Sequence, residues 1–214
     1  MARRFFLFLT VSIFLFASCK KVEKSYFDNG TIRSIVSKKG DAFDGNCIWY
    51  HENGQKQYEC NYNNNKLEGE AIRYYHGGRV QSVEVFKDNI LEGKVKNYDS
   101  DGKVSKEENY VKGVLQGAFH IYYPNGKKRI DGIYKDGLYD GKWYYYDAGG
   151  KLVGVGEFME GTGKQKAWYP NGNLKREINY SDNLKNGMEI WYSEDGSIEK
   201  TLEYMNGEVL SDDE

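Results

Sequence analysis

Apolar and aromatic residues recur along this chain at a fixed spacing, and that recurrence predicts its structure. From Gly30 to Gly196 a glycine returns every 24 residues, with a single step of 22. A second glycine follows most of these 15 residues later, and large aromatic residues stand eight and twenty residues after the first glycine. A period of roughly 20–50 residues indicates a repeat architecture. The chain therefore consists of about eight copies of one unit.

Two aromatic series mark the copies, and only Lys38, in the first copy, interrupts them. The series at eight residues is Tyr62, Phe86, Tyr110, Tyr134, Phe158, Tyr180 and Tyr204. The series at twenty residues is Tyr50, Tyr74, Tyr98, Tyr122, Tyr146, Trp168 and Tyr192. Short aromatic and aliphatic runs between clusters of Gly, Asn and Asp predict strands and turns. No convincing amphipathic helix follows Cys19.

The turn at the first glycine of each copy has a consistent sequence, such as HENG, DSDG or YPNG. Two hairpins fit it: a two-residue type I′ loop, or a three-residue loop in which a type I turn ends in a left-handed glycine. Pro124 and Pro170 stand two residues before the glycine, where the shorter loop needs a backbone N–H donor. We therefore predict the three-residue loop. It places each aromatic of the twenty-residue series opposite the residue two after the glycine.

A second turn in each copy, such as YNNNKLEG or YKDGLYDG, carries Asn or Gly eleven residues after the first glycine, or Asp41 in the first copy. We expect left-handed backbone there. The chain then alternates strand and turn throughout. The predicted fold is all-β: an elongated, single-layer antiparallel meander of about eight 24-residue hairpin repeats, with about sixteen short strands over residues 26–210. Without a second layer, its stability depends on aromatic residues that stack from copy to copy.

The N-terminus, MARRFFLFLTVSIFLFASCKK, has a different pattern. Arg3 and Arg4 precede an apolar run, Phe5–Phe16, whose 12 residues fall short of a bilayer span. This is the layout of a secretory signal peptide. The small residues directly before Cys19 resemble a bacterial lipobox, in which the cysteine becomes the lipidated first residue of the mature protein. Phe16 departs from the usual aliphatic residue, and a plain signal peptide that happens to carry a cysteine is the alternative.

The lipobox resemblance divides the chain into four parts. Residues 1–18 are a lipoprotein signal peptide, residues 19–25 a short tether, residues 26–210 the repeat array and residues 211–214 an acidic tail. Acyl chains on Cys19 would hold the mature protein to a membrane. The resemblance implies a cell-envelope lipoprotein of a Gram-negative bacterium, in the outer membrane rather than the inner one.

The recurrent Y-x-x-x-G-K…Y-x-x-G-x-L-x-G pattern resembles the bacterial variant of the MORN repeat. Good matches are YYPNGKKRIDGIYKDGLYDGKWYYY, from Tyr122, and YDSDGKVSKEENYVKGVLQGAFHIYY, from Tyr98. The resemblance covers nearly all of the mature chain and implies a β-hairpin array that binds or scaffolds other molecules. Bacterial relatives are often catalogued as antitoxin-like, and many are lipoproteins. The resemblance implies no catalytic residues.

Composition and motifs argue against several classes of function. The formal charge of −2 lacks the basic footprint of nucleic-acid binding. The three His stand at different repeat positions, whereas metal ligands cluster. GVGEFMEGTGK, at Gly154–Lys164, lacks the spacing of a phosphate-binding loop. Acidic residues, such as Glu107, Glu108 and Glu177, alternate with Lys and Arg as on a solvated strand. We expect no enzyme activity, no metal and no cofactor.

Cys47 and Cys60 flank one hairpin in what the signal peptide predicts to be an oxidising compartment. A two-residue loop at Gly54 would place them directly opposite each other, where a disulfide is feasible. The three-residue loop favoured above shifts the pairing by one residue and places them on opposite faces. That loop therefore disfavours the disulfide, and the question stays open.

Aromatic residues outside the two series are the candidates for partner binding, because the repeat does not demand them and Tyr and Trp suit interfaces. They gather just before the first turn, so we expect them to line up along one edge of the array. The candidates are Trp49, Tyr75, Tyr123, Trp143, Tyr145, Tyr169 and Trp191.

The sequence favours a non-enzymatic, lipid-anchored repeat protein that binds a protein partner or serves as a scaffold in the cell envelope. The alternative is an antitoxin-like inhibitor that captures one specific toxin or effector. Glycan binding by the exposed aromatic residues is a further alternative. An enzyme would need a convergent acid–base cluster, and nothing in the sequence marks one.

Overall fold

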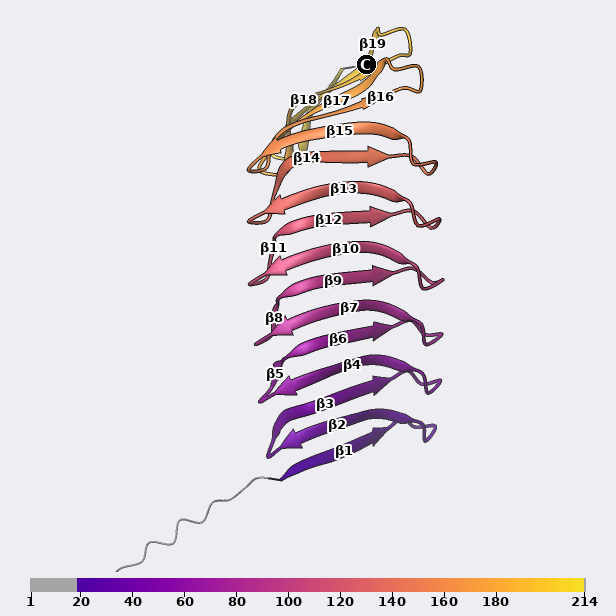
Figure 1. Cartoon of the computed structure of the whole chain (residues 1–214), viewed down its shortest axis with the longest axis vertical. Helices are drawn as coiled ribbons and strands as arrows, with labels where there is room; N and C mark the ends of the chain where they lie inside the picture. Colours follow the sequence, from indigo (N-terminus) through magenta and orange to yellow (C-terminus); the bar gives the residue numbers. More distant parts are fainter. Residues whose placement is uncertain (1–18, 214) are drawn as a thin grey trace, which may run out of the picture.

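The computed structural model describes residues 19–213, which form one long antiparallel sheet (Figure 1). Twenty strands lie in this part of the chain, and three two-residue strands, β5, β8 and β11, continue after one residue into β6, β9 and β12. The strands are β1 (Lys20–Tyr26), β2 (Ile32–Lys39), β3 (Ala42–Tyr50), β4 (Lys56–Asn63), β5 (Lys66–Leu67), β6 (Gly69–Tyr74), β7 (Val80–Lys87), β8 (Ile90–Leu91), β9 (Gly93–Tyr98), β10 (Val104–Val111), β11 (Val114–Leu115), β12 (Gly117–Tyr122), β13 (Lys128–Lys135), β14 (Leu138–Tyr146), β15 (Leu152–Met159), β16 (Thr162–Trp168), β17 (Leu174–Ser181), β18 (Leu184–Tyr192), β19 (Ile198–Met205) and β20 (Glu208–Asp213).

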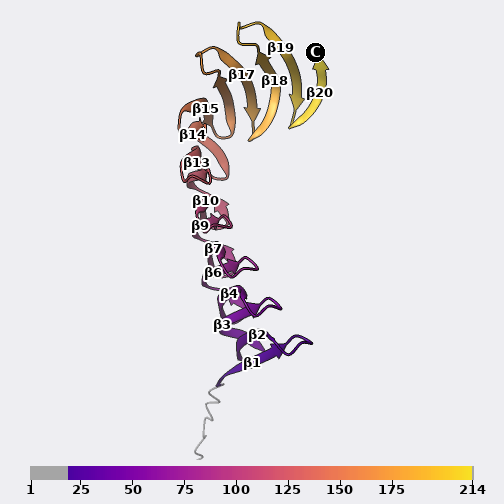
Figure 2. The same cartoon turned by 90° about the vertical axis from the view of Figure 1, so that its right-hand side faces the viewer.

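The sheet is a meander, because each strand pairs with the next strand along the chain when β5, β8 and β11 are counted together with β6, β9 and β12. It stays open: β1 lies at one edge and β20 at the other, and no second layer of the described residues covers either face (Figures 1 and 2). The predicted all-β, single-layer array of hairpins is confirmed.

The array is longer at both ends than the sequence predicted. Residues Lys20–Ser25, assigned above to a tether, belong to β1 and pair with β2 from Lys20↔Lys39 onward. At the other end β20 extends to Asp213, within the segment predicted to be a polar tail. Free hydrogen-bonding groups at the edges of β2 and β19 explain both extensions, since polar residues can pair there as well as apolar ones. The predicted signal peptide, residues 1–18, lies outside the described residues.

The first turn of each copy is the predicted three-residue loop. At YPNG the Gly126 N–H donates to the Tyr123 carbonyl at 2.8 Å, and the Tyr123 N–H donates to Lys127 at 2.9 Å. Gly126 has φ +81°, the left-handed angle of the bulge, and Pro124 fills the first central position of the type I turn. The predicted aromatic pairs follow: Tyr50↔Lys56, Tyr74↔Val80, Tyr98↔Val104, Tyr122↔Lys128, Tyr146↔Leu152, Trp168↔Leu174 and Tyr192↔Ile198.

A second bulge in the same hairpins overturns one prediction. After Tyr50↔Lys56 the next pair is Trp49↔Tyr58, so Gln57 has no partner of its own. The extra residue shifts the register back by one. Cys47 therefore lies directly opposite Cys60, and the expectation that they sit on opposite faces is wrong. Both are free thiols in this structure.

From the second copy on, the second turn is a two-residue loop with two left-handed residues, the signature of a type I′ turn. In the first copy only Gly40 is left-handed, and Asp41 is not. Asn64 and Asn65, at φ +49° and +64°, are an example. The Asn65 N–H also donates to the Phe43 carbonyl of the previous copy at 2.9 Å, and the Asn65 side chain accepts from the Phe43 N–H at 2.7 Å. The predicted left-handed Asn or Gly is confirmed from the second copy on, and there it also joins neighbouring copies.

Aromatic rings stack between copies as the sequence predicted. One cluster surrounds Cys47 and Cys60, with Phe43 and Tyr62 rings 5.3 Å apart beside them. A second surrounds Trp143, with rings of Phe119, Tyr134, Tyr139, Phe158 and Tyr180 around it. Edge and tilted ring pairs of this kind contribute about 0.5–1.5 kcal/mol each beyond their buried area. A single sheet therefore gains a core along one face.

The sheet changes direction near the shortened copy. In Figure 2 the strands before β14 are seen nearly edge-on, whereas β17–β20 face the viewer. The two missing residues fall between Gly161 and Gly163, and β15 pairs with β16 without a bulge. Asn183, in the turn of the following copy, reaches two copies back, where it accepts from the Tyr139 N–H at 2.7 Å and donates to the Gly137 carbonyl at 2.9 Å. The deletion is thus bridged by one side chain.

Candidate partner-binding surface

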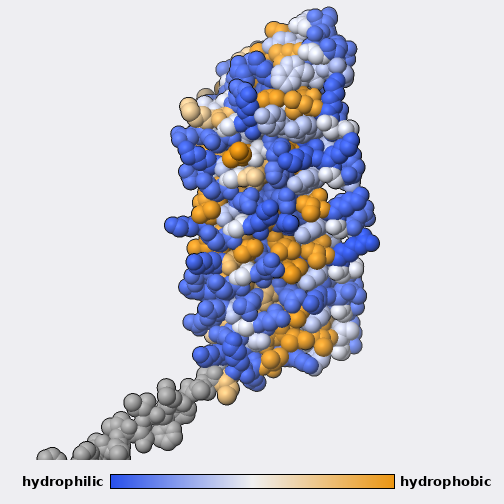
Figure 3. All heavy atoms as spheres, viewed as in Figure 1, coloured by the Kyte–Doolittle hydropathy of each residue, from blue (hydrophilic) through white to orange (hydrophobic). Residues whose placement is uncertain are grey.

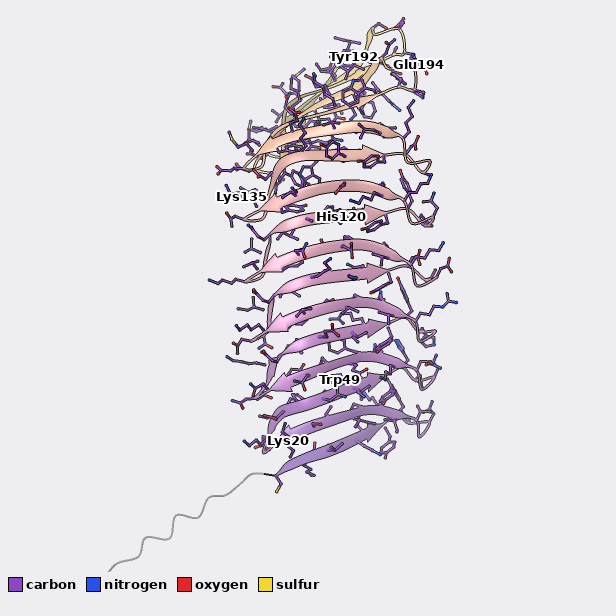
Figure 4. The ribbon with its side chains drawn as sticks, in the orientation of Figure 1. Lys20, Trp49, His120, Lys135, Tyr192 and Glu194 are labelled. Carbon is purple, nitrogen blue, oxygen red and sulfur yellow. The ribbon has the colours of Figure 1, made fainter. Side chains whose placement is uncertain are left out.

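The two faces of the sheet differ in chemistry. Side chains alternate between faces along a strand, and directly opposite residues share a face. Cys47, Trp49 and Trp143 therefore lie on one face, which also carries the buried clusters and which we call the aromatic face. Side chains cover the sheet and both of its turn edges along the whole array (Figure 4).

The other face, the charged face, carries neutralised carboxylates. Glu177 lies 3.2 Å from Lys166 and also bonds to Lys164, and these cations hold its pKa below the usual range. Glu107 accepts from the Tyr122 hydroxyl at 2.9 Å, and burial together with this bond raises the pKa of Tyr122 to about 12. Paired charges of this kind suit a solvated sheet surface, as predicted for Glu107 and Glu177. The same prediction is wrong for Glu108, which is 8% exposed, lies opposite Val95 on the aromatic face and pairs with Lys106 at 2.9 Å.

Three of the predicted binding residues join neighbouring copies. The hydroxyls of Tyr75, Tyr123 and Tyr169 donate to the carbonyls of Tyr98, Tyr146 and Tyr192 at 2.7–2.9 Å, in each case 23 residues along the chain. They lie half-buried at the edge formed by the first turns. Their repeated bond gives each of them a structural role.

Trp143 is not available to a partner. Only 3% of it is exposed, its Nε1–H donates to the Ile133 carbonyl at 3.1 Å, and it packs over Gly132. A Cβ on Gly132 would stand 2.3 Å from the indole ring, so the glycine makes room for it. The sequence-based selection of Trp143 as a surface residue is corrected: it is a core residue.

The remaining three candidates, Trp49, Tyr145 and Trp191, occupy one repeat position on the aromatic face. Other copies place different residues there, namely Arg73, Asn97, Ile121 and Ala167. Trp49 lies 5.8 Å from the Tyr58 ring, and Tyr145 packs against the cluster around Trp143. Burial, with smaller contributions from neighbouring tyrosines, raises the pKa of Tyr145. Trp191 is also half-buried, and it borders a hollow in the surface.

A groove lies beside Trp191, close to the first turns of the last copies. It has a volume of about 580 Å³ and is lined by Tyr169, Lys175, Trp191, Glu199 and Lys200. A second hollow of about 390 Å³ shares three of these residues and extends over Ala167 and Val153. We call the two together the C-terminal groove. Figure 4 labels Tyr192 and Glu194 at this end of the array.

A small residue opens the groove. Ala167 stands where neighbouring copies have Tyr145 and Trp191, and it pairs with Gly154 on one side and Arg176 on the other. A methyl group and a glycine fill little of the space that a ring would occupy. The row of large side chains is therefore interrupted between Tyr145 and Trp191.

Cations flank the rings of the groove. The Arg176 guanidinium lies 4.2 Å from the Trp191 ring centre, and the Lys175 ammonium lies 5.3 Å from that of Tyr169. Cation–π contacts of this kind hold both rings in place. The groove thus presents apolar ring faces beside positive charge.

A buried carboxylate holds Arg176 in place beside the groove. Glu189 is 1% exposed and bonds to Arg176 and to Lys185, whose ammonium lies at 2.6 Å. Burial alone would raise the pKa of Glu189, but these two cations hold it below the usual range. Because Arg176 also stacks on Trp191, the ion pair orients the ring that lines the groove.

The sequence identified two aromatic residues of the groove and missed its cations. Tyr169 and Trp191 were candidates, whereas Lys175, Arg176 and Lys200 were not distinguished from other surface charges. Ala167 was the available signal, because it is the smallest residue at a repeat position that is otherwise large or polar.

The strand pattern and turn geometry agree with the comparison of the sequence with known families. A model described as MORN repeat variant matches residues 43–64, 91–112, 115–136, 162–182 and 185–206, together about half of the chain. The chain belongs to the MORN repeat variant family. The intervening segments, 65–90 and 137–161, form hairpins of the same kind, so the MORN-type array is continuous through them.

Other comparisons add little to the family assignment. No curated protein matches this MORN-type chain. Among solved structures, it is similar to a chain of "Crystal Structure of TcdB2-TccC3-Cdc42", with 12% identity and a TM-score of 0.23. That match covers 90% of this chain and only 14% of the other.

Among residues 19–213 no group of three or more His, Cys, Asp or Glu side chains is placed to hold a metal ion. The structure does bring His51 and His76 together at the first-turn edge, with ring centres 4.9 Å apart, which the sequence did not predict. No helix long and apolar enough to cross a membrane occurs in the described region.

Proposed function

We propose that this protein is a non-enzymatic, lipid-anchored component of the cell envelope that binds a protein partner through the C-terminal groove. The observation that carries the proposal is the groove itself: two aromatic rings, Tyr169 and Trp191, beside the cations Lys175 and Arg176. Aromatic and arginine side chains dominate the energetics of protein interfaces.

The form of the array supports a binding role. Both faces of the sheet are open along the described chain, so a partner has access to either of them. On the side seen in Figure 3, apolar side chains are interspersed with polar ones and form no single large patch. A mixed surface of this kind is typical of reversible interfaces rather than obligate ones.

The membrane anchor is supported by the position of Cys19. It is exposed and directly precedes β1, so an acyl chain on its sulfur would not disturb the array. The proposed signal peptide would be removed up to this residue.

Membrane fractionation tests the anchor. We expect the native chain to sediment with membranes and to enter a detergent phase. Cys19→Ala protein from which the signal peptide has been removed should do neither. If processed Cys19→Ala protein still partitions with membranes, the lipid anchor is refuted.

Affinity capture tests the binding role. The full chain, immobilised and exposed to envelope extract in detergent, should retain at least one protein that blank resin does not retain. The retained protein should be purified and its stoichiometry measured. A tight one-to-one complex with a single toxin or effector would replace the scaffold function with an inhibitor function, and retention of glycan alone would contradict protein binding.

A further inference from the structure

Cys47 and Cys60 form a directly opposed pair at the centre of one hairpin. They lie on neighbouring strands β3 and β4, in the register Cys47↔Cys60, and both side chains point to the aromatic face. Directly opposite residues in an antiparallel pair have Cα atoms about 4.5–5.5 Å apart. A disulfide needs about 4.4–6.8 Å. The backbone is therefore already placed for a bond between the two sulfur atoms.

The pair is enclosed by other residues of the core. Cys47 is 0% exposed and Cys60 is 2% exposed, and they pack with Val36 and Ala71. The same position in the next two copies holds pairs that contain no thiol, namely Ala71↔Glu84 and Val95↔Glu108. The two cysteines thus meet because both occur at one register position of one hairpin.

We propose that Cys47 and Cys60 are joined by a disulfide when the β3–β4 hairpin folds in the presence of a disulfide oxidant. One thiolate attacks the oxidant and forms a mixed disulfide, which releases one thiol of the oxidant. The other cysteine then attacks the mixed disulfide, forms the Cys47–Cys60 bond and releases the second thiol. The two cysteines lose two electrons and two protons in total, and the oxidant's disulfide is reduced to two thiols.

The fold restricts this reaction to the time of folding. Once β2 and β6 flank the hairpin, the sulfur atoms are out of reach of an oxidant. Burial also raises the pKa of Cys47, and burial together with the neighbouring Cys47 raises the pKa of Cys60 to about 11. The thiolate is the reactive form, so the folded dithiol is unreactive near neutral pH. The redox state that the hairpin acquires as it folds is retained afterwards.

Peptide mapping of the full chain tests the proposal, because Lys39, Lys56 and Lys66 let trypsin separate the two cysteines. Residues 40–56 contain Cys47 and residues 57–66 contain Cys60, while Cys19 lies in another peptide. Full-length protein is unfolded in denaturant with reductant, then refolded with a mixture of oxidised and reduced glutathione. Without reductant the digest should give the two peptides joined, lighter than their sum by two hydrogen atoms, and with reductant it should give them separately.

A second sample tests the timing. Full-length protein refolded under reducing conditions is transferred to the same glutathione mixture. We expect the Cys47–Cys60 bond to form at least about tenfold more slowly than during refolding, since both sulfur atoms are buried away from the oxidant and the raised pKa of each thiol lowers its thiolate fraction.

Variants keep the result decisive. Cys47→Ala should fold, because the next copy has Ala71 at the same repeat position. It should give no joined peptide and leave Cys60 as a free thiol. If the refolded native chain yields both peptides alkylated and separate, the disulfide is refuted. If the folded dithiol oxidises as fast as the refolding chain, the restriction to folding is refuted.

Discussion

Several residues in the second turns have an unfavourable backbone conformation. Lys112 and Glu160 both have φ +50°, an angle that residues other than Gly, Asn and Asp rarely adopt. The Lys112 N–H donates to the Glu92 carboxylate of the previous copy at 2.7 Å, which offsets part of that strain. The turn type forces the angle, because a type I′ loop needs two left-handed residues whatever side chains they carry.

Replacing Lys112 by Gly should stabilise the protein by about 0.5–1 kcal/mol, because glycine removes the strain of a left-handed angle and keeps the N–H donor. Urea unfolding of the full chain would measure this. The control, Lys87→Gly, changes a residue at the end of β7 whose φ is not positive, and it should destabilise by a similar amount. Destabilisation by Lys112→Gly would contradict the turn assignment.

The pKa of Glu189 predicts an acid-sensitive C-terminal region. Its folded pKa lies below that of the unfolded chain, near 4.3, because Lys185 and Arg176 stabilise the charged form against burial. The stabilisation is therefore complete above about pH 4.3 and is lost as pH falls through the folded value. Glu189→Gln should lower the free energy of unfolding at pH 7 by about 2 kcal/mol. It should also make the free energy of unfolding depend less on pH between pH 5 and about 3. Thermal unfolding of both proteins at several pH values measures this. If the ion pair contributes nothing, stability will change with pH to the same extent in Glu189→Gln as in the native chain.

At the scale of strands and turns, the sequence predicted those turns whose backbone conformation only a few residue types can adopt. Gly126 and Pro124 fixed the type of the first turn and hence the pairing of Tyr122 with Lys128. The second bulge could not be predicted, because the residue it leaves unpaired can be of any type: Gln57 in one copy and Lys175 in another. That bulge reversed the expected relation of Cys47 and Cys60.

Asn183 should contribute more stability than the same residue in an ordinary copy. It makes two side-chain hydrogen bonds, to Tyr139 and Gly137, whereas Asn65 makes one, to Phe43. Asn183→Gly should destabilise by about 2 kcal/mol and Asn65→Gly by about 1 kcal/mol, since glycine keeps the left-handed angle and removes only the side chain. Chemical denaturation of the two variants compares them, and equal losses would show that the bridge across the short copy carries no extra stability.

At the scale of the whole molecule, the repeat predicted the array but not its binding surface. The prediction placed seven aromatic residues along one edge. In the structure Trp143 is buried, and Tyr75, Tyr123 and Tyr169 bond to the next copy. The groove forms because Ala167 has no ring to fill the space, and cations from neighbouring strands line it. Sequence reasoning that looks for large residues does not detect a cavity made by a small one.

The most direct test of the central claim compares two tryptophans at the same repeat position. Trp191 lines the C-terminal groove, whereas Trp49 lies in the N-terminal cluster, and each stacks on a neighbouring side chain. The amount of partner retained from envelope extract is measured for the native chain, Trp191→Ala and Trp49→Ala, each checked for folding by circular dichroism. We predict at least a tenfold loss of retention for Trp191→Ala and little change for Trp49→Ala. Undiminished retention by folded Trp191→Ala would contradict the assignment of partner binding to the groove.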